Sequence, residues 1–391
     1  MTEISGEWLP QFDGVQAALA ASLDAGTDLG ASVAVLLGGE PVVDIWGGWT
    51  DSERTRPWQR DTIVNLFSTS KTILGLCGLV LADRGELDLD APVARYWPEF
   101  AAEGKDGILI RHVLGHTAGI AGWDDPITEE DLYDWDKVTT LLARQRPWWT
   151  PGTDAGYHTL TQGYLFGEVV RRITGVSIGT FIRDELAHPL AADYHVGVPS
   201  EALARVADLI PPPPLDFDVT PESMETMPMR VLANPVVRAE TTWTTPWRRA
   251  EIPSVNGHGN ARSVAALQSV LACGGQAGGQ RLMTPAGCEA VFREQSRGVD
   301  LVLGVPVRRG LGYAINSADT PVGPNDRTCF WSGWGGSMVV VDLEARLVIA
   351  YVMNRMEAGI DAQGEAQIVD PRAMRIVNAT YAALTRTNIS H

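Results

Sequence analysis

The stretch Phe67-Ser68-Thr69-Ser70-Lys71 lies where an extended run, residues 62–67, meets a long apolar segment. Beyond it, apolar side chains recur at the spacing of one helix face, at Ile73, Leu76, Cys77, Val80 and Leu81. Because residues three apart share a helix face, we expect Lys71 beside Ser68 in the first turn of a buried helix. The stretch therefore predicts a hydroxyl next to an amine at the positive end of a helix dipole.

This pairing of side chains suits nucleophilic catalysis. The helix dipole and the apolar surroundings both lower the pKa of Lys71, so that its neutral amine can accept the proton of Ser68. The chain has only three lysines, Lys71, Lys105 and Lys137, and otherwise uses arginine, which does not give up its proton. The alternative is structural: Ser68 would cap the helix while Lys71 extends from its first turn to solvent. These residues alone favour neither interpretation.

Size, charge and cysteine usage narrow the class of protein. With 391 residues, the chain can bury one large core or two smaller ones. A formal charge of −17 argues against nucleic acid or an anionic membrane as partner. Residues 1–7 lack the basic and apolar regions of a signal peptide, and no run reaches the roughly 18 apolar residues of a membrane span. The four cysteines have no metal-ligand spacing, so we expect reduced thiols in a cytoplasmic protein.

The order of the expected elements predicts the fold. A helix over residues 12–25 and a hairpin around residues 38–41 precede the Ser68 helix, and residues 110–199 are mostly helical. Strands over residues 310–315, 329–331, 337–342 and 346–353 and a helix over residues 371–385 complete the chain. We therefore predict an α/β fold with an antiparallel sheet flanked by helices and built from both termini.

The same order predicts two domains. Residues 1–85 and 255–391 would form the α/β domain that carries the sheet, and residues 86–254 an inserted, mainly helical domain with aromatic loops. The active site would lie in the cleft between them. Residues 211–255, rich in proline and without clear periodicity, form either a linker or an ordered excursion over that cleft.

Two further segments could complete a site. Tyr157 precedes a helix expected to begin near Leu160, where a nearby lysine could lower the phenol pKa and let Tyr157 relay a proton. The alternative is an ordinary half-buried tyrosine. Residues 331–337 precede a strand, and their glycines would let a backbone N–H approach an oxyanion, unless they form only a turn.

Two other motifs are interpreted as structural. Gly175-Val176-Ser177-Ile178-Gly179 matches the nucleophile elbow of α/β-hydrolases, but that elbow needs a buried strand before it. A helical pattern precedes it here, so we expect Ser177 to cap the following helix. His112 and His116 have the i, i+4 spacing of a shared metal site. No third ligand is in register, so no metal is predicted.

The motifs, taken in chain order, resemble those of the serine β-lactamase-like superfamily of penicillin-binding proteins and β-lactamases. Ser68-Thr69-Ser70-Lys71 matches the Ser-x-x-Lys motif, followed by Tyr157 and Trp334-Gly335-Gly336. Further matching stretches are Leu114-Gly115-His116-Thr117-Ala118-Gly119, similar to L-x-H-T-[SA]-G, then Pro151-Gly152 and Gly310-Leu311-Gly312-Tyr313. Over residues 15–385 the chain is most similar to the family VIII carboxylesterases, relatives of class C β-lactamases and D-Ala-D-Ala carboxypeptidases.

The resemblance implies a role for each matched residue. Ser68 would be the nucleophile, Lys71 its base and Tyr157 the group that protonates the leaving group and activates the deacylating water. The backbone N–H groups of Ser68 and Ser337 would form the oxyanion hole.

Two departures from the β-lactamase pattern bear on the substrate. Thr159 stands where class C enzymes have the asparagine of Y-x-N, and Trp334-Gly335-Gly336 stands where they have K-T-G. Without that lysine and that amide, the site lacks groups that would bind the carboxylate and acylamino side chain of a lactam or peptide. The residues expected to contact substrate are thus Thr159, Trp334, Gly335 and Gly336.

These observations predict a cofactor-free serine carboxylesterase. It would hydrolyse small-molecule short-chain or aryl esters through an acyl-enzyme on Ser68. The alternatives are an amide, peptide or β-lactam hydrolase that uses the same site, and a non-catalytic penicillin-binding-like module that only binds a ligand.

Overall fold

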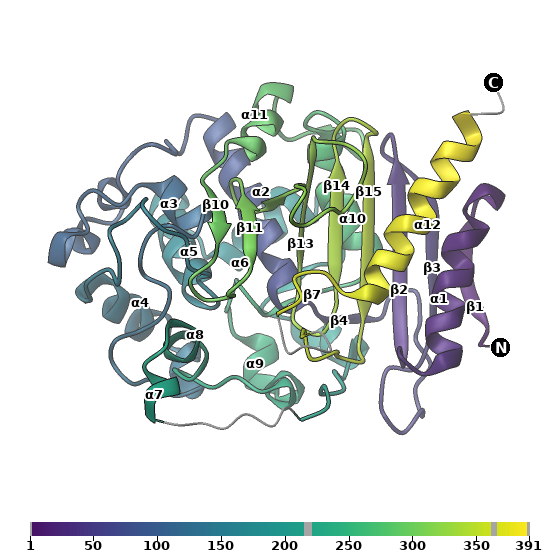
Figure 1. The fold of residues 1–391 in the computed structure, drawn as a ribbon, viewed down its shortest axis with the longest axis horizontal. Coiled ribbons are helices and arrows are strands. Elements are labelled where there is room, and N and C mark those ends of the chain that lie inside the picture. The colour runs from purple at the N-terminus through teal and green to yellow at the C-terminus, as the bar shows by residue number, and fades with distance from the viewer. Residues whose placement is uncertain (1, 215–220, 361–365, 389–391) are drawn as a thin grey trace.

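The computed structural model describes residues 2–214, 221–360 and 366–388, and a nine-stranded antiparallel sheet forms its centre (Figure 1). The strand order is β1-β3-β2-β15-β14-β13-β12-β11-β10. The strands are β1 Ile4–Trp8, β2 Gly30–Leu37, β3 Glu40–Gly48, β10 Ser296–Val299, β11 Pro306–Arg309, β12 Ala314–Ile315, β13 Thr328–Ser332, β14 Met338–Asp342 and β15 Leu347–Met353. The two ends of the chain meet where β15 pairs with β2.

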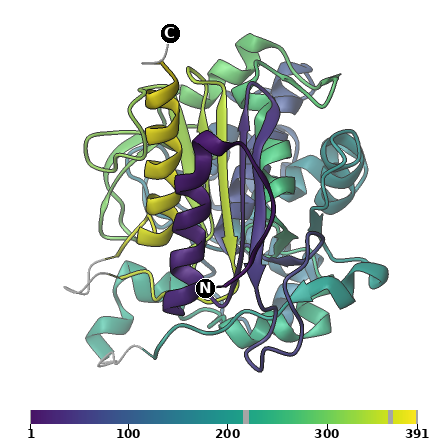
Figure 2. The same cartoon turned by 90° about the vertical axis from the view of Figure 1, so that its right-hand side faces the viewer.

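Helices cover both faces of this sheet. Helices α1 (Asp13–Ala25) and α12 (Pro371–Asn388) lie side by side on one face (Figure 2), and α10 (Ala261–Ala272) packs on β2 and β15 from the other. Helix α1 ends as its sequence predicts, at Gly26 in the left-handed conformation with φ 72°. The predicted fold class, an antiparallel sheet flanked by helices and built from both termini, is confirmed.

The middle of the chain is mainly helical. Its helices are α3 Ile110–Leu114, α4 Trp135–Arg144, α5 Thr161–Thr174, α6 Ile178–Phe181, α7 Pro221–Met224, α8 Met227–Leu232 and α9 Thr245–Arg249, with α11 Pro285–Glu289 further on. Two smaller sheets are present. One has the strand order β5 His195–Val196, β7 Gly257–Gly259, β4 Ile63–Asn65 and β6 Val206–Ala207. The other pairs β8 Gln276–Ala277 with β9 Gln280–Arg281. The division into domains at residues 85 and 255 stays a prediction. Within the described ranges, no helix is both long and apolar enough to cross a bilayer.

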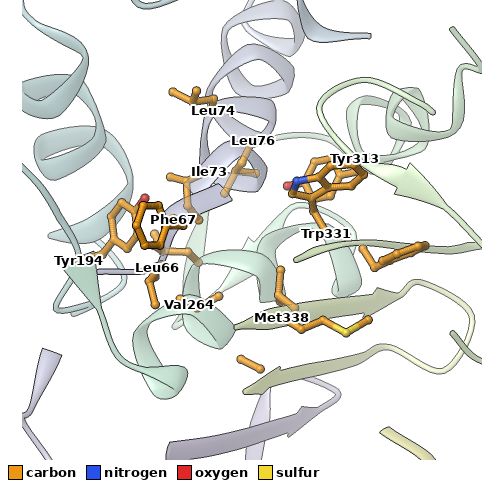
Figure 3. Packing of buried hydrophobic residues seen from close by; sticks show 14 of the residues in the cluster. Leu66, Phe67, Ile73, Leu74, Leu76, Tyr194, Val264, Tyr313, Trp331 and Met338 are labelled. Carbon is orange, nitrogen blue, oxygen red and sulfur yellow. The ribbon is translucent and has the colours of Figure 1, made fainter. Parts of the chain in front are cut away.

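Helix α2, Ser70–Asp83, runs through the interior, and its residues 70–81 are all buried. Figure 3 shows Phe67, Ile73 and Leu76 at this helix within the apolar core. The segment Gly310-Leu311-Gly312-Tyr313, expected as part of a strand, is instead a loop between β11 and β12 on which α2 packs. The reason is the close approach of two backbones. Gly312 has φ 80°, and a Cβ placed there would lie 2.4 Å from the Cα of Gly75.

Replacing Gly75 by alanine is expected to lower the free energy of unfolding by about 1–3 kcal/mol, the usual effect of overpacking. The added Cβ would lie 2.8 Å from a ring carbon of Tyr313 and 3.0 Å from the Cα of Gly312. Chemical denaturation would measure the change. Gly107→Ala is the matched control, because a Cβ there meets no heavy atom within 4 Å. Equal stability of the two variants would contradict this account of the helix–loop contact.

Candidate active site

Ser68 lies at the strand-to-helix junction that the sequence indicated. It occupies a 3-10 turn, Phe67–Thr69, between β4 and α2, and its side chain lines a cavity of about 830 Å³. The preceding residue, Phe67, has φ 43°, a left-handed conformation that is strained for a bulky side chain. The surrounding core holds this strained turn, because Phe67 and Ser68 are only 3% and 7% exposed. The hydroxyl of Ser68 thus faces a cavity while its backbone is fixed by packing.

Lys71 is buried beside Ser68. Its Nζ lies 3.3 Å from Ser68 Oγ, 2.7 Å from the carbonyl oxygen of Thr159 and 3.1 Å from that of Ser254. In the described part of the chain no carboxylate forms an ion pair with it, and burial holds its pKa well below the usual lysine value. The interpretation of Lys71 as a solvent-exposed side chain is therefore wrong, since it is 1% exposed. A neutral amine would donate both protons to the two carbonyls and direct its lone pair at the hydroxyl of Ser68.

Tyr157 completes this cluster, in the loop before α5. Lys71 Nζ lies 4.8 Å from the centre of the phenol ring, and the indole Nε1 of Trp331 donates to the Tyr157 hydroxyl at 3.1 Å. Burial raises the pKa of Tyr157, and hydrogen bonds with Ser68 and Trp331 oppose the rise only in part. The expectation that a nearby lysine lowers this pKa is therefore wrong, because desolvation outweighs the other effects. At neutral pH, Tyr157 is a protonated phenol able to donate.

In the glycine-rich segment, residues 331–337, the tryptophan that contacts Tyr157 lies three residues before the one expected from the sequence. The motif resemblance placed Trp334 where class C β-lactamases have the lysine of K-T-G. The tryptophan that reaches Tyr157 is instead Trp331, on β13. Trp334 lies in the turn after that strand, 38% exposed, with its ring centre 5.0 Å from that of Phe67. Both tryptophans precede a glycine within two residues, so spacing alone did not distinguish them. The strand register does, because side chains alternate between faces and only one tryptophan is directed at the phenol.

Ser337 and Trp334 occupy different positions relative to the cavity. The hydroxyl of Ser337 donates to the carbonyl of Leu66 at 2.9 Å, and its own carbonyl accepts from Gly333 at 2.8 Å. Ser337 is 2% exposed and is not part of the cavity lining, whereas Trp334 and Ser68 are. Within the described residues, neither the N–H of Ser68 nor that of Trp334 donates to a protein acceptor. These two N–H groups are thus available to a ligand.

The cavity has a volume of about 830 Å³ and a largely apolar lining. The predicted substrate contacts Thr159, Trp334, Gly335 and Gly336 all line it. Residues 231–237, within the segment predicted as a linker or an excursion, also contribute side chains to the lining of this cavity. Asn234 anchors this part of the segment, because its amide donates to the carbonyls of Trp123 and Asp125 at 3.0 Å each.

Charged groups also line this cavity. Arg372 is bound to Asp370, to Asp28 and to the carbonyl of Gly335, so its guanidinium is fully engaged. Glu357, which is exposed, adds negative charge to the same lining. Asp370 and Arg375, whose Nη2 donates to Ser22 Oγ at 3.3 Å, line it as well, so both signs of charge border the cavity.

The side chains of the two motifs interpreted as structural make local hydrogen bonds. Ser177 caps α6, where its Oγ accepts from the N–H of Thr180 at 3.2 Å and donates to Glu251 at 2.7 Å. His112 Nδ1 accepts from the N–H of Leu109, and His116 Nδ1 from that of His158. Burial lowers the pKa of His112 to about 4 and that of His116 well below its usual value. No group of three or more His, Cys, Asp or Glu side chains suited to a metal occurs in the described residues.

Sequence reasoning missed two charged residues behind the site. Arg309 and Asp300 form an ion pair, Nη2 to Oδ2, of 2.8 Å, and both side chains are buried. The backbone N–H of Tyr157 donates to the other carboxylate oxygen of Asp300 at 3.1 Å. The local sequence does not distinguish Arg309 from its neighbour Arg308. Successive side chains of β11 point to opposite faces of the sheet, and for this reason only Arg309 is buried.

Comparison with known proteins agrees with this geometry. The family model described as Beta-lactamase matches residues 15–371. The chain is 34% identical over 361 residues to the esterase/beta-lactamase LipL of Mycobacterium tuberculosis, covering 89% of this chain and 82% of that protein. A crystal structure of a family VIII carboxylesterase superposes with a TM-score of 0.90 at 39% identity, covering 97% of this chain and all of the other.

A penicillin-binding protein homologue from Caulobacter crescentus superposes with a TM-score of 0.88 at 36% identity, covering 98% of this chain and 100% of that one. The family resemblance inferred from the motifs is therefore confirmed. Because the family model covers most of the chain and the fold agrees over nearly all of it, the protein belongs to the beta-lactamase family and is a serine hydrolase.

Proposed function

We propose that this protein is a serine carboxylesterase that hydrolyses neutral, apolar short-chain or aryl esters through an acyl-enzyme on Ser68. It would need no cofactor. The relatives named as an esterase/beta-lactamase and as a family VIII carboxylesterase support ester hydrolysis.

The observation that carries the proposal is the indole of Trp331 against the hydroxyl of Tyr157. An ammonium group at this position would attract the carboxylate of a β-lactam or peptide, whereas an indole N–H is neutral and its ring is apolar. Arg372, which also lines the cavity, is already paired with Asp370 and Asp28. The position beside Tyr157 therefore favours a substrate without a negative charge there.

Acyl transfer would follow from the positions of four residues. Lys71 removes the proton of Ser68 as the hydroxyl attacks the ester carbonyl, and the oxyanion accepts hydrogen bonds from the backbone N–H groups of Ser68 and Trp334. We assign the second donor to Trp334 rather than to Ser337, because Trp334 lines the cavity with an unengaged N–H.

Collapse of the tetrahedral intermediate then expels the alcohol. Tyr157 protonates the departing alkoxide, and the proton held by Lys71 returns to Tyr157, so both groups end as they began. A water molecule that loses its proton to the same pair hydrolyses the acyl-enzyme and releases the acid.

Substrate preference tests the proposal. We expect kcat/KM for 4-nitrophenyl butyrate to exceed that for a chromogenic cephalosporin by at least about 100-fold, the effect of roughly 3 kcal/mol of lost carboxylate recognition. Both substrates are followed by absorbance with the same enzyme preparation, and Ser68→Ala gives the background. Comparable turnover of the cephalosporin would replace the esterase with a β-lactamase that uses the same nucleophile.

A further inference from the structure

Arg309 is an unusual buried charge. Its side chain lies at the end of β11, 2% exposed, and pairs with Asp300, whose side chain is fully buried. Apart from this ion pair of 2.8 Å, Nε, Nη1 and Nη2 have no hydrogen-bond acceptor among the described residues. The guanidinium is therefore buried with most of its donors unused.

Stability does not explain such a pair. Removing an arginine and a carboxylate from water costs several kcal/mol per ion, and a buried ion pair is often no more stable than an apolar replacement. The partners differ in how their charge is compensated. Asp300 Oδ1 accepts from the N–H groups of Tyr157, Val302 and Leu303 at 3.1, 2.8 and 2.8 Å, whereas Arg309 has only its carboxylate. The charge of Arg309 is therefore offset by fewer polar contacts than the charge of Asp300.

The positive charge of Arg309 lies over the indole that is bonded to Tyr157. The guanidinium carbon lies 5.7 Å from the ring centre of Trp331, whose indole N–H is bonded to the Tyr157 hydroxyl. Arg309 and Asp300 are also the two charged residues that act on the pKa of Tyr157, in opposite directions, and the effect of Arg309 is the larger.

Burial disfavours the charged forms of the other titratable groups around the phenol. They are Lys71, His116, whose ring centre is 4.9 Å from that of Tyr157, and His158. Burial holds the pKa of Lys71 and of His116 well below the usual values and that of His158 at about 3. In the resting site, the fixed charges near Tyr157 are thus those of Arg309 and Asp300.

We propose that Arg309 is a positioning residue of this active site, whose positive charge stabilises Tyr157 as its phenol gives up a proton to the leaving group. This inference rests on the proposed esterase function. When the proton moves from the Tyr157 hydroxyl to the departing alkoxide, a phenolate forms on the side chain bonded to Trp331, and the guanidinium of Arg309 lies over that indole. It persists until Lys71, protonated by Ser68 in the acylation step, returns a proton. Asp300 holds both the guanidinium and the backbone of Tyr157 in place.

The choice of leaving group separates this role from simple structural support. An alkyl ester expels a basic alkoxide that needs the proton of Tyr157, whereas 4-nitrophenolate leaves as a stable anion without it. We expect Arg309→Gln to lower kcat/KM for ethyl butyrate, followed by pH-stat titration, by about tenfold or more. The same variant should change kcat/KM for 4-nitrophenyl butyrate by less than about threefold. Arg309→Lys, which keeps the charge, should restore the alkyl ester rate.

The pH profile gives a second readout. Removing a positive charge raises the pKa of every neighbouring group, so both limbs of the kcat/KM profile for ethyl butyrate should move up by about one pH unit in Arg309→Gln. If this variant folds poorly, the double variant Asp300→Asn, Arg309→Gln removes both charges at nearly constant volume. Because Arg309 has the larger of the two opposing effects on Tyr157, it should give a smaller loss that is still confined to the alkyl ester.

The outcomes distinguish this inference from the proposed function. If Arg309→Gln lowers kcat/KM equally for both esters and leaves both limbs of the pH profile unchanged, the role proposed for Arg309 is wrong. The proposed esterase function would still stand. Full ester hydrolysis by Ser68→Ala would instead overturn the proposed function itself.

Discussion

Ser68→Ala is expected to lower kcat for 4-nitrophenyl butyrate by at least about 10⁴-fold, since loss of a nucleophile removes the covalent pathway and leaves only binding and oxyanion stabilisation. The lost hydroxyl lies 3.3 Å from a buried amine and lines the cavity of about 830 Å³. Steady-state hydrolysis, corrected for the spontaneous rate, measures the effect. Intact mass after treatment with a fluorophosphonate should show one adduct on the wild-type protein and none on the variant.

Ser177→Ala is the matched control, because Ser177 lies in the other serine motif of the sequence. Its hydroxyl caps α6 and bonds Glu251, so the variant should lose about 1 kcal/mol of stability and keep its activity within roughly twofold. Loss of activity in Ser177→Ala together with full activity in Ser68→Ala would restore the α/β-hydrolase interpretation. A fluorophosphonate adduct on neither serine would favour a non-catalytic binding module.

Lys71→Met should be nearly as damaging, with a loss of about 10³-fold or more in kcat. General-base assistance contributes roughly 10²–10⁴-fold, and without it the hydroxyl of Ser68 is a weak nucleophile. Lys71→Arg should not rescue the rate, because a guanidinium keeps its proton and has no lone pair to offer. Recovery of activity in Lys71→Arg would mean that the positive charge, rather than the base, is needed.

Lys105 provides the control for burial of a lysine. It is also fully buried, and its Nζ donates to the carbonyls of Ala102 and Gln145. It does not line the cavity. Lys105→Met should therefore leave kcat unchanged while it lowers stability by about 1–3 kcal/mol, the effect of two carbonyls left without a donor.

The pH dependence of the wild type should reflect the amine of Lys71. Burial lowers the pKa of Lys71, and only its neutral form can accept a proton from Ser68. The rising limb of kcat/KM should therefore lie well below pH 10, so that hydrolysis is already efficient near neutral pH. The limb should be absent from the residual activity of Lys71→Met.

Local chemistry explains why much of the site could be predicted from the sequence. A helical apolar repeat after Ser68 places Lys71 on the same face at i+3 whatever the rest of the chain does, because helix geometry is independent of tertiary contacts. The N-cap role of Ser177 is local for the same reason, as are the left-handed glycines Gly26 and Gly175 that end helices α1 and α5.

Residues brought together from distant segments could not be predicted in this way. Trp331 rather than Trp334 reaches Tyr157 because β13 pairs with β14 in one register, and that register is set by the whole sheet. The pKa of Tyr157 moved opposite to expectation because burial, which the sequence does not display, outweighed its neighbours. Gly310-Leu311-Gly312-Tyr313 is a loop because α2 packs against it at backbone distance.

The amino-acid sequence thus sufficed for the fold class and for the pairing of Ser68 with Lys71, since both depend on periodicity along one segment. The identity of the tryptophan at the phenol, the N–H group open to an oxyanion and the burial of Arg309 with Asp300 required the folded chain. Each of these depends on strand register and on desolvation, and both are properties of segments far apart in sequence.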